Sequence, residues 1–146
     1  MQNHRQLRVW RQAHDLALSV RRACRVFPRT GYGSLKSQIV RAAESVLFNI
    51  VEGCGTSSQR EFARFLDISI KSTAELEAQL ELARDYGIVE PLNWRALNTD
   101  VIDTRKMLCG LRTKVLETHT KTTNVSDRVT GSALPETRGV EGVSRI

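Results

Sequence analysis

The chain has 146 residues, of which 40% are hydrophobic and 26% charged, so its size suits one globular domain with one core. Three separated cysteines (Cys24, Cys54 and Cys109) exclude a disulfide framework and paired-cysteine zinc sites, and they favour a reducing, cytoplasmic environment. The sequence shows no apolar signal core and no apolar stretch of membrane-spanning length, so neither secretion nor a membrane partner is expected.

The net charge of +6 is distributed unevenly. Residues 1–41 contain nine Lys and Arg side chains and a single acid, Asp15, whereas residues 42–118 contain nine basic and twelve acidic side chains. The excess positive charge therefore lies in the first quarter of the chain. Such an excess favours nucleic acid or an acidic protein surface as the partner.

Apolar residues at helical spacing predict a first helix over residues 6–27. Its buried stripe contains Val9, Ala13, Leu16, Val20, Ala23 and Phe27. The helix should end at Phe27-Pro28, because proline disfavours the helical conformation in the residue before it. After a turn, Ser34 is the expected N-cap of a second helix, which runs to about residue 51 and stops at two glycines.

The second helix carries two adjacent apolar rows, an arc wider than a single neighbouring helix requires. One row contains Leu35, Ile39, Ala42, Val46 and Ile50, and the other contains Val40, Ala43, Leu47 and Val51.

Ser58 and Glu61 form a capping-box pattern that predicts the start of a third helix, which ends at Tyr86-Gly87. Pro91 and Asn93 predict the start of a fourth helix. Helical periodicity is lost after about residue 118, so residues 1–118 form the predicted domain and residues 119–146 a predicted disordered tail. Because the connections are short, consecutive helices should run antiparallel. The expected fold is an all-α, up-down-up-down four-helix bundle.

The first helix also carries a stripe of arginines, at alternating spacings of three and four shared with Asp15 and Leu18. We call it, with its neighbours, the arginine stripe; it consists of Arg5, Arg8, Arg11, Arg21, Arg22, Arg25 and Arg29. One interpretation is a track for phosphates, because a guanidinium donates two parallel hydrogen bonds to phosphate. The other is a solvated surface, or a surface that pairs with acids of a neighbouring helix or subunit. No aromatic residue interleaves the stripe, which argues against base stacking.

Polar residues form matching rows on the second and third helices. The predicted network consists of Arg41, Ser45, Asn49, Glu52, Ser72 and Glu75. A turn near residue 56 brings Arg41 level with Ser72 and Glu75, which predicts an Arg41–Glu75 ion pair. A structural network is favoured over a catalytic carboxylate site, because no nucleophile, base and orienting group line up.

Two other features are interpreted as structural. The Gly-rich loop over residues 53–58 could hold an anion on its backbone amides, but a turn with an N-cap is favoured because no Walker lysine follows. Cys54 could have a lowered pKa at a helix end, yet it is treated as a packing residue. The histidines at positions 4, 14 and 119 do not cluster, so no metal and no cofactor are implied.

Several segments together resemble a known family over about residues 7–116. They are Val9-Trp10-x-x-Ala13, Val26-Phe27-Pro28, Gln38-Ile39-Val40-Arg41-Ala42-Ala43-x-Ser45-x-x-x-Asn49-Ile50-x-Glu52-Gly53, Glu61-Phe62-x-x-Phe65-Leu66 and Ser72-x-x-Glu75-Leu76-Glu77-x-Gln79-Leu80. The pattern resembles the bacterial four-helix-bundle proteins encoded in intervening sequences of large-subunit ribosomal RNA genes. That family is related to the accessory proteins of diversity-generating retroelements.

The resemblance implies an antiparallel four-helix bundle that assembles as a homopentameric barrel and is not an enzyme. It implies RNA as a partner, with DNA left open, and a reverse transcriptase as a candidate protein partner. The basic surface would map to the first helix, and Arg41, Asn49, Glu52 and Glu75 would have structural or interface roles. The expected function is a non-enzymatic nucleic-acid-binding scaffold. The alternatives are a protein–protein adaptor with a basic face, an intervening-sequence protein of another role, and a hydrolase or toxin-like enzyme, which lacks a catalytic constellation.

Overall fold

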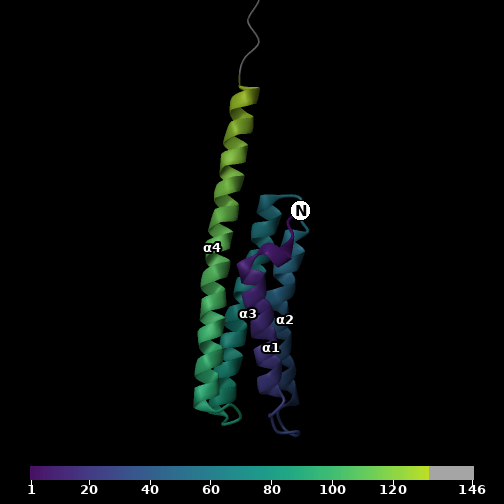
Figure 1. Cartoon of the computed structure of the whole chain (residues 1–146), viewed down its shortest axis with the longest axis vertical. Helices are drawn as coiled ribbons and strands as arrows, with labels where there is room; N and C mark the ends of the chain where they lie inside the picture. Colours follow the sequence, from purple (N-terminus) through teal and green to yellow (C-terminus); the bar gives the residue numbers. More distant parts are fainter. Residues whose placement is uncertain (132–146) are drawn as a thin grey trace, which may run out of the picture.

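The computed structural model describes residues 1–131, and this part of the chain consists of helices joined by short connections (Figure 1). A 3-10 helix, η1 (His4–Gln6), precedes α1 (Arg8–Cys24), α2 (Gly33–Cys54), α3 (Gln59–Asp85) and α4 (Pro91–Thr130). No β-strand occurs in residues 1–131, so the all-α prediction with four long helices is confirmed. Among the helices described, none combines the length and apolar character needed to cross a membrane.

The four long helices surround one elongated core. α2 packs most extensively against α3, α3 against α4, and α1 against both α2 and α4. The apolar rows predicted from the sequence supply the buried side chains. One cluster includes Leu16, Ile39 and Leu80, and a second includes Ile50 and Leu108. On α2, the second apolar row is mostly half-buried, so part of the wide apolar arc remains at the surface.

The helix ends follow the local signals in part. The Ser58 hydroxyl accepts a hydrogen bond from the Glu61 amide at 3.1 Å, as the capping pattern predicts. Gly87 has φ of 77°, which ends α3 in the left-handed conformation that glycine favours. The Ser34 prediction is wrong: α2 begins at Gly33, and its N-cap residue, Tyr32, makes no side-chain capping hydrogen bond.

Gly53 lies inside the last turn of α2 and does not stop the helix, contrary to the sequence prediction. It is buried against α3, and a Cβ at this position would lie 2.6 Å from Cδ2 of Phe62. The absence of a side chain therefore lets the start of α3 pack closely on the end of α2. This close approach positions the α2–α3 pair, which carries the polar network.

α4 continues to Thr130 and extends beyond the other three helices at the top of Figure 1. The predicted boundary at residue 118 is therefore wrong as a helix end, and residues 132–146 of the predicted tail lie outside the described part. The sequence did not predict this part of the helix, because its many Thr residues give no apolar periodicity. The hydroxyls of Thr118, Thr122 and Thr123 each donate to the carbonyl four residues earlier, so they do not compete with the helical backbone.

Candidate nucleic-acid interface

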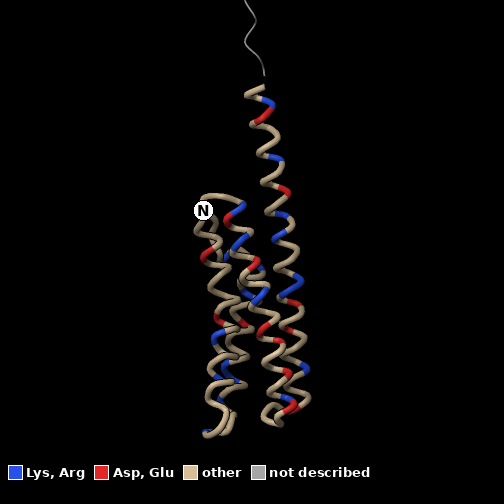
Figure 2. Tube along the Cα trace, turned by 180° about the vertical axis from the view of Figure 1, so that it is seen from behind, with Lys and Arg blue, Asp and Glu red and all other residues tan. Residues whose placement is uncertain are grey.

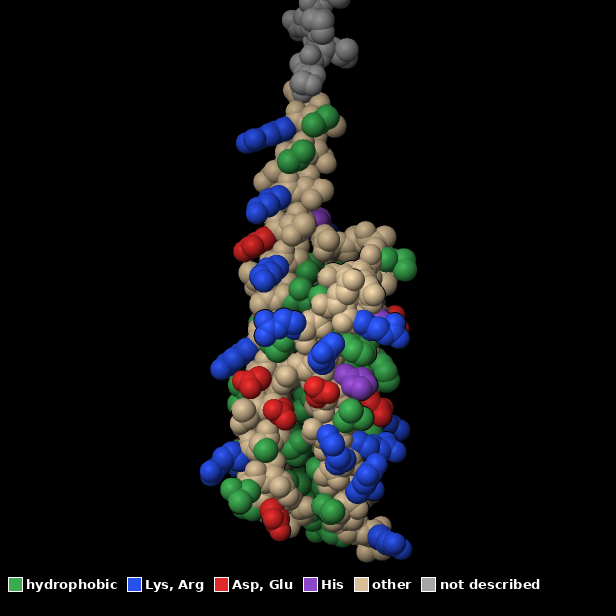
Figure 3. All heavy atoms as spheres, viewed as in Figure 1, with side chains coloured by type: hydrophobic (Ala, Val, Ile, Leu, Met, Phe, Trp, Pro, Cys, Tyr) green, Lys and Arg blue, Asp and Glu red, His purple; other side chains and the backbone are tan. Residues whose placement is uncertain are grey.

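The arginine stripe lies on the solvent face of α1. Its opposite face supplies the buried residues Val9, Ala13, Leu16, Val20 and Cys24. This division places Arg8, Arg11, Arg21, Arg22 and Arg25 on the side away from the core. Arg5 comes from η1 and Arg29 from the connection to α2, and all seven side chains are exposed. Figure 3 shows basic side chains gathered over the lower part of α1.

No arginine of the stripe forms an ion pair within residues 1–131. Asp15, the acid in the stripe, lies 4.0 Å from Nδ1 of His14. The alternative in which the stripe pairs with acids of a neighbouring helix of the same chain is therefore wrong. The guanidinium groups face solvent with their donors available for an external anion.

The stripe borders two hollows in the surface. One, of about 500 Å³, lies between the start of α1 and α4 and is lined by Arg5, Arg8 and Arg11 together with Met107. The other, of about 550 Å³, lies between α1 and α2 and is lined by Arg21 and Arg25 among others. The basic side chains thus surround concave surface at both ends of α1.

Two arginines of α4 behave differently. Arg105 on α4 donates to Glu77 and to the Thr73 hydroxyl of α3, and Arg112 donates to Asp67. The hydrogen bond to Asp67 raises the pKa of the Arg112 guanidinium. Figure 2 shows acidic and basic positions interspersed along α4. These pairs hold two helices together and leave little net charge for a partner.

The polar network forms in part. The Ser45 and Ser72 hydroxyls share a hydrogen bond of 2.8 Å between α2 and α3, and Asn49 Nδ2 donates to the Ser45 carbonyl at 2.8 Å. Ser69, which the sequence places at the apolar row of the third helix together with the polar residues of the network, donates to the Val46 carbonyl at 2.7 Å and is fully buried. Its place within the apolar row of the third helix was the available sequence signal.

The predicted Arg41–Glu75 ion pair is wrong. Both side chains are exposed, Glu75 Oε1 accepts a hydrogen bond from Gln79 Nε2 at 3.1 Å, and Arg41 makes no ion pair in the described chain. Glu52 is exposed and likewise makes none in residues 1–131. An exposed pair gains little Coulomb energy and costs side-chain entropy, which explains why matching the register of two helices did not suffice.

The remaining residues singled out by the sequence have structural roles. The loop after α2 is a turn with an N-cap, as favoured: the Thr56 hydroxyl donates to the Gly53 carbonyl at 2.7 Å. Burial raises the pKa of the Cys54 thiol, which contradicts a lowered value and agrees with a packing role. Within residues 1–131, no group of three or more His, Cys, Asp or Glu side chains could hold a metal ion.

One feature beside the stripe was not anticipated from the sequence. The Trp10 ring lies between the rings of His4 and His14, with centroid distances of 5.2 Å on each side. Trp10 and His14 are four residues apart on one helix, and that spacing was the available signal. The three rings are half-buried, and their contacts link η1 to the start of α1.

The sequence model of the 23S rRNA-intervening sequence protein family matches residues 5–110. This chain belongs to that family. A solved structure of a protein of unknown function from the S23 ribosomal protein family of Bacteroides thetaiotaomicron is similar to it, with a TM-score of 0.67 and 22% identity. The similarity covers 71% of this chain and 97% of the other and shows a shared fold. No curated protein matches the sequence.

The family match runs from Arg5 in η1 through the first three long helices to Gly110 in α4, so it includes the whole arginine stripe and the polar network. The remaining part of α4, which extends past the bundle in Figure 1, lies outside it. The resemblance noted in the sequence is thus confirmed for the intervening-sequence family.

Proposed function

We propose that this member of the family is a non-enzymatic, homo-oligomeric scaffold that binds nucleic acid, and RNA in particular. The observation that carries the proposal is the arginine stripe: seven exposed arginines, none in an ion pair within residues 1–131. Arginine is suited to phosphate because its planar fork donates two parallel hydrogen bonds. An extended helix face of this kind can follow several phosphates of one strand.

The proposal includes self-assembly, with a pentameric ring as the expected form. Its support is apolar surface at the α1–α2 side of the bundle. Phe48 is 56% exposed and Leu18 49% exposed, and they line a hollow of about 260 Å³ together with Leu47 and Val40. A neighbouring subunit would bury this surface and would place several arginine stripes around one assembly. Repetition increases avidity without any new contact.

Two finer points belong to the same proposal. The short connections between consecutive helices support an antiparallel, up-down-up-down arrangement. The resemblance to retroelement accessory proteins extends the function to assisting a reverse transcriptase, with RNA and the enzyme sharing the basic surface. A ring that presents many copies of a basic face suits that role, because it can hold an RNA and a protein at once.

The test measures binding of the full chain to a structured RNA and to DNA at low and high salt, with the mass determined in the same buffers. We expect submicromolar RNA binding by an oligomer, weakening several-fold as salt is added, because each neutralised phosphate releases counterions. Charge reversal by Arg8→Glu, Arg22→Glu or Arg25→Glu should weaken binding further.

Arg95→Glu is the matched control, because Arg95 is an exposed arginine on α4 that makes no ion pair in the described chain. It should change RNA affinity by less than any reversal in the stripe. An assembled protein that binds neither RNA nor DNA would contradict the proposal. Reversals that leave RNA binding intact but release an acidic protein partner would support the adaptor alternative.

A further inference from the structure

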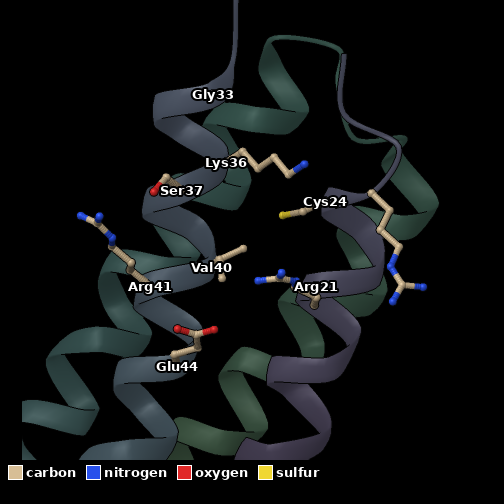
Figure 4. A pocket seen from close by; sticks show the side chains of 9 residues that line it. Arg21, Cys24, Gly33, Lys36, Ser37, Val40, Arg41 and Glu44 are labelled. Atoms are coloured by element: carbon tan, nitrogen blue, oxygen red, sulfur yellow. The ribbon is translucent and has the colours of Figure 1, made fainter. Parts of the chain in front are cut away.

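A groove between the end of α1 and the start of α2 is bordered by four basic residues from two helices (Figure 4). Arg21 and Arg25 line it from α1, and Lys36 and Arg41 line it from α2. Its volume of about 550 Å³ lies within the range of sites for small molecules. Arg21 and Arg25 belong to the arginine stripe, but Lys36 and Arg41 do not. The stripe alone therefore does not explain the positive charge of the groove.

The side chains at the centre of the groove approach the same place. In Figure 4, Lys36 and Arg21 extend from facing helices into the space beside Cys24, whereas Arg41 and Ser37 lie on the outer side of α2. Burial raises the pKa of the Cys24 thiol, and the charges of Lys36 and Arg21 act against this rise. Both cations are therefore close enough to act on one buried group.

The positive charge of the groove is not neutralised internally. None of the four basic side chains forms an ion pair in residues 1–131, and Glu44 is the acid among the lining residues. The first turn of α2 adds to the effect, because Gly33 lines the groove and that turn contains no acidic residue and no capping side chain. Free amides and the helix dipole at this end favour an anion.

We propose that the groove binds a terminal phosphate group with two or more negative charges. Either a nucleoside polyphosphate or the 5′-phosphorylated end of an RNA supplies that chemistry. An internal phosphodiester carries one charge, which would leave one of the two cations that extend into the groove without a partner. Among residues 1–131, no aromatic side chain lines the groove, so recognition is directed at the phosphate and not at a base.

This site does not depend on RNA binding by the stripe. Lys36 is the residue that separates the two, because it lies in the groove and outside the arginine stripe. Inorganic pyrophosphate tests the shared chemistry. ATP, and two RNA oligomers of one sequence with either a 5′-triphosphate or a 5′-hydroxyl, distinguish the two sources.

Titrations of the full chain at moderate salt should show that pyrophosphate binds and that the 5′-triphosphate RNA binds more tightly than the 5′-hydroxyl RNA. Lys36→Glu should weaken pyrophosphate binding by at least about tenfold, because it replaces a charge-assisted hydrogen bond by a repulsion. Lys106→Glu is the matched control on α4, an exposed lysine outside the groove, and should change the affinity by less than about twofold.

Several results would overturn the proposal: no binding of pyrophosphate, ATP or the triphosphate end, or equal losses in the two lysine variants, which would indicate a general charge effect. Tight binding of 5′-hydroxyl RNA with no gain from the triphosphate would contradict the phosphate site but not the scaffold function. Pyrophosphate binding without binding of 5′-hydroxyl RNA would support the phosphate site and contradict the scaffold function. Circular dichroism and the Tm of Lys36→Glu show whether the fold is unchanged, as its exposed position predicts.

Discussion

Arginines on α1 and on α4 belong to the same small bundle but have different surroundings. Arg105 and Arg112 of α4 lie opposite Glu77 and Asp67 of α3 and form ion pairs with them. Within residues 1–131, the arginines of α1 form no ion pair with an acid of α2 or α4. A basic residue on a helix surface therefore has no fixed role, because its role depends on what the neighbouring helix presents.

The two groups of arginines therefore have different expected roles, those of α4 in stability and those of α1 in binding. Ion pairs between α3 and α4 contribute to helix contact, and their removal should affect folding more than affinity. The arginines of the stripe repel one another, and Arg21 and Arg22 offset part of that repulsion through the dipole at the end of α1, so removal of stripe charges should affect affinity more than stability.

Replacing three stripe residues together, by Arg8→Ala, Arg22→Ala and Arg25→Ala, should weaken RNA binding by about a hundredfold or more at low salt. Three phosphate contacts are then lost, so the slope of log K against log salt should become shallower by about two to three. Fluorescence anisotropy over a salt series measures both quantities. The Tm should remain the same or rise, and a large fall in Tm would place the stripe among the stabilising residues.

Arg105→Ala should lower the free energy of unfolding by about 1 kcal/mol, because it removes the ion pair to Glu77 and the hydrogen bond to the Thr73 hydroxyl. Thr73 keeps its hydrogen bond to the Ile70 carbonyl, which limits the loss. Urea unfolding measures the change. RNA affinity should vary by less than about twofold; a loss comparable to that of a stripe variant would remove the distinction between the two surfaces.

The Ser45–Ser72 hydrogen bond should contribute about 0.5–1 kcal/mol to the α2–α3 contact. A double-mutant cycle with Ser45→Ala, Ser72→Ala and the double variant measures the coupling by chemical unfolding. A coupling near zero would mean that the two hydroxyls are each satisfied by backbone groups alone, as Ser72 also donates to the Ile68 carbonyl.

Asp100→Asn should give the smallest effect, a rise in stability that depends on pH. Burial, with the charges of Asp103 and Asp15, raises the pKa of the Asp100 carboxyl above its ordinary value of 3.8. The folded chain then binds the proton more tightly than the unfolded chain. The stability that this group contributes to the protein is therefore lost as pH rises through its pKa in the folded state. The variant should gain in Tm at neutral pH and not well below pH 3.8; an equal gain at both would exclude this cause.

The sequence predicts the fold well because its main signals are local and periodic. The rows through Leu16, Ile39 and Leu76 are buried as their spacing predicts, and the Ser58 cap forms. Errors arise where one residue has two uses. Gly53 was interpreted as a helix stop, but its lack of a side chain serves the contact with Phe62, which depends on a helix distant in space.

The site is less predictable, because pairing depends on the partner helix and on side-chain rotamers. Spacing places Arg41 level with Glu75, yet both side chains face solvent. The groove could not be predicted from the sequence for the same reason. Lys36 has no distinguishing sequence pattern, and only the packing of α1 against α2 brings it opposite Arg21. The composition of the last part of α4 suggested a disordered tail, because Thr hydroxyls that bond to the helix backbone give no apolar periodicity.

The most direct test of the central claim is the salt dependence of RNA affinity for the full chain beside Arg22→Glu and the control Arg95→Glu. The account predicts a steep, linear fall of log K with log salt, a weaker and shallower line for Arg22→Glu, and a line for Arg95→Glu that overlays the unmodified chain. Affinity independent of salt, or equal losses in both variants, would contradict the claim that the unpaired arginines of α1 bind nucleic acid.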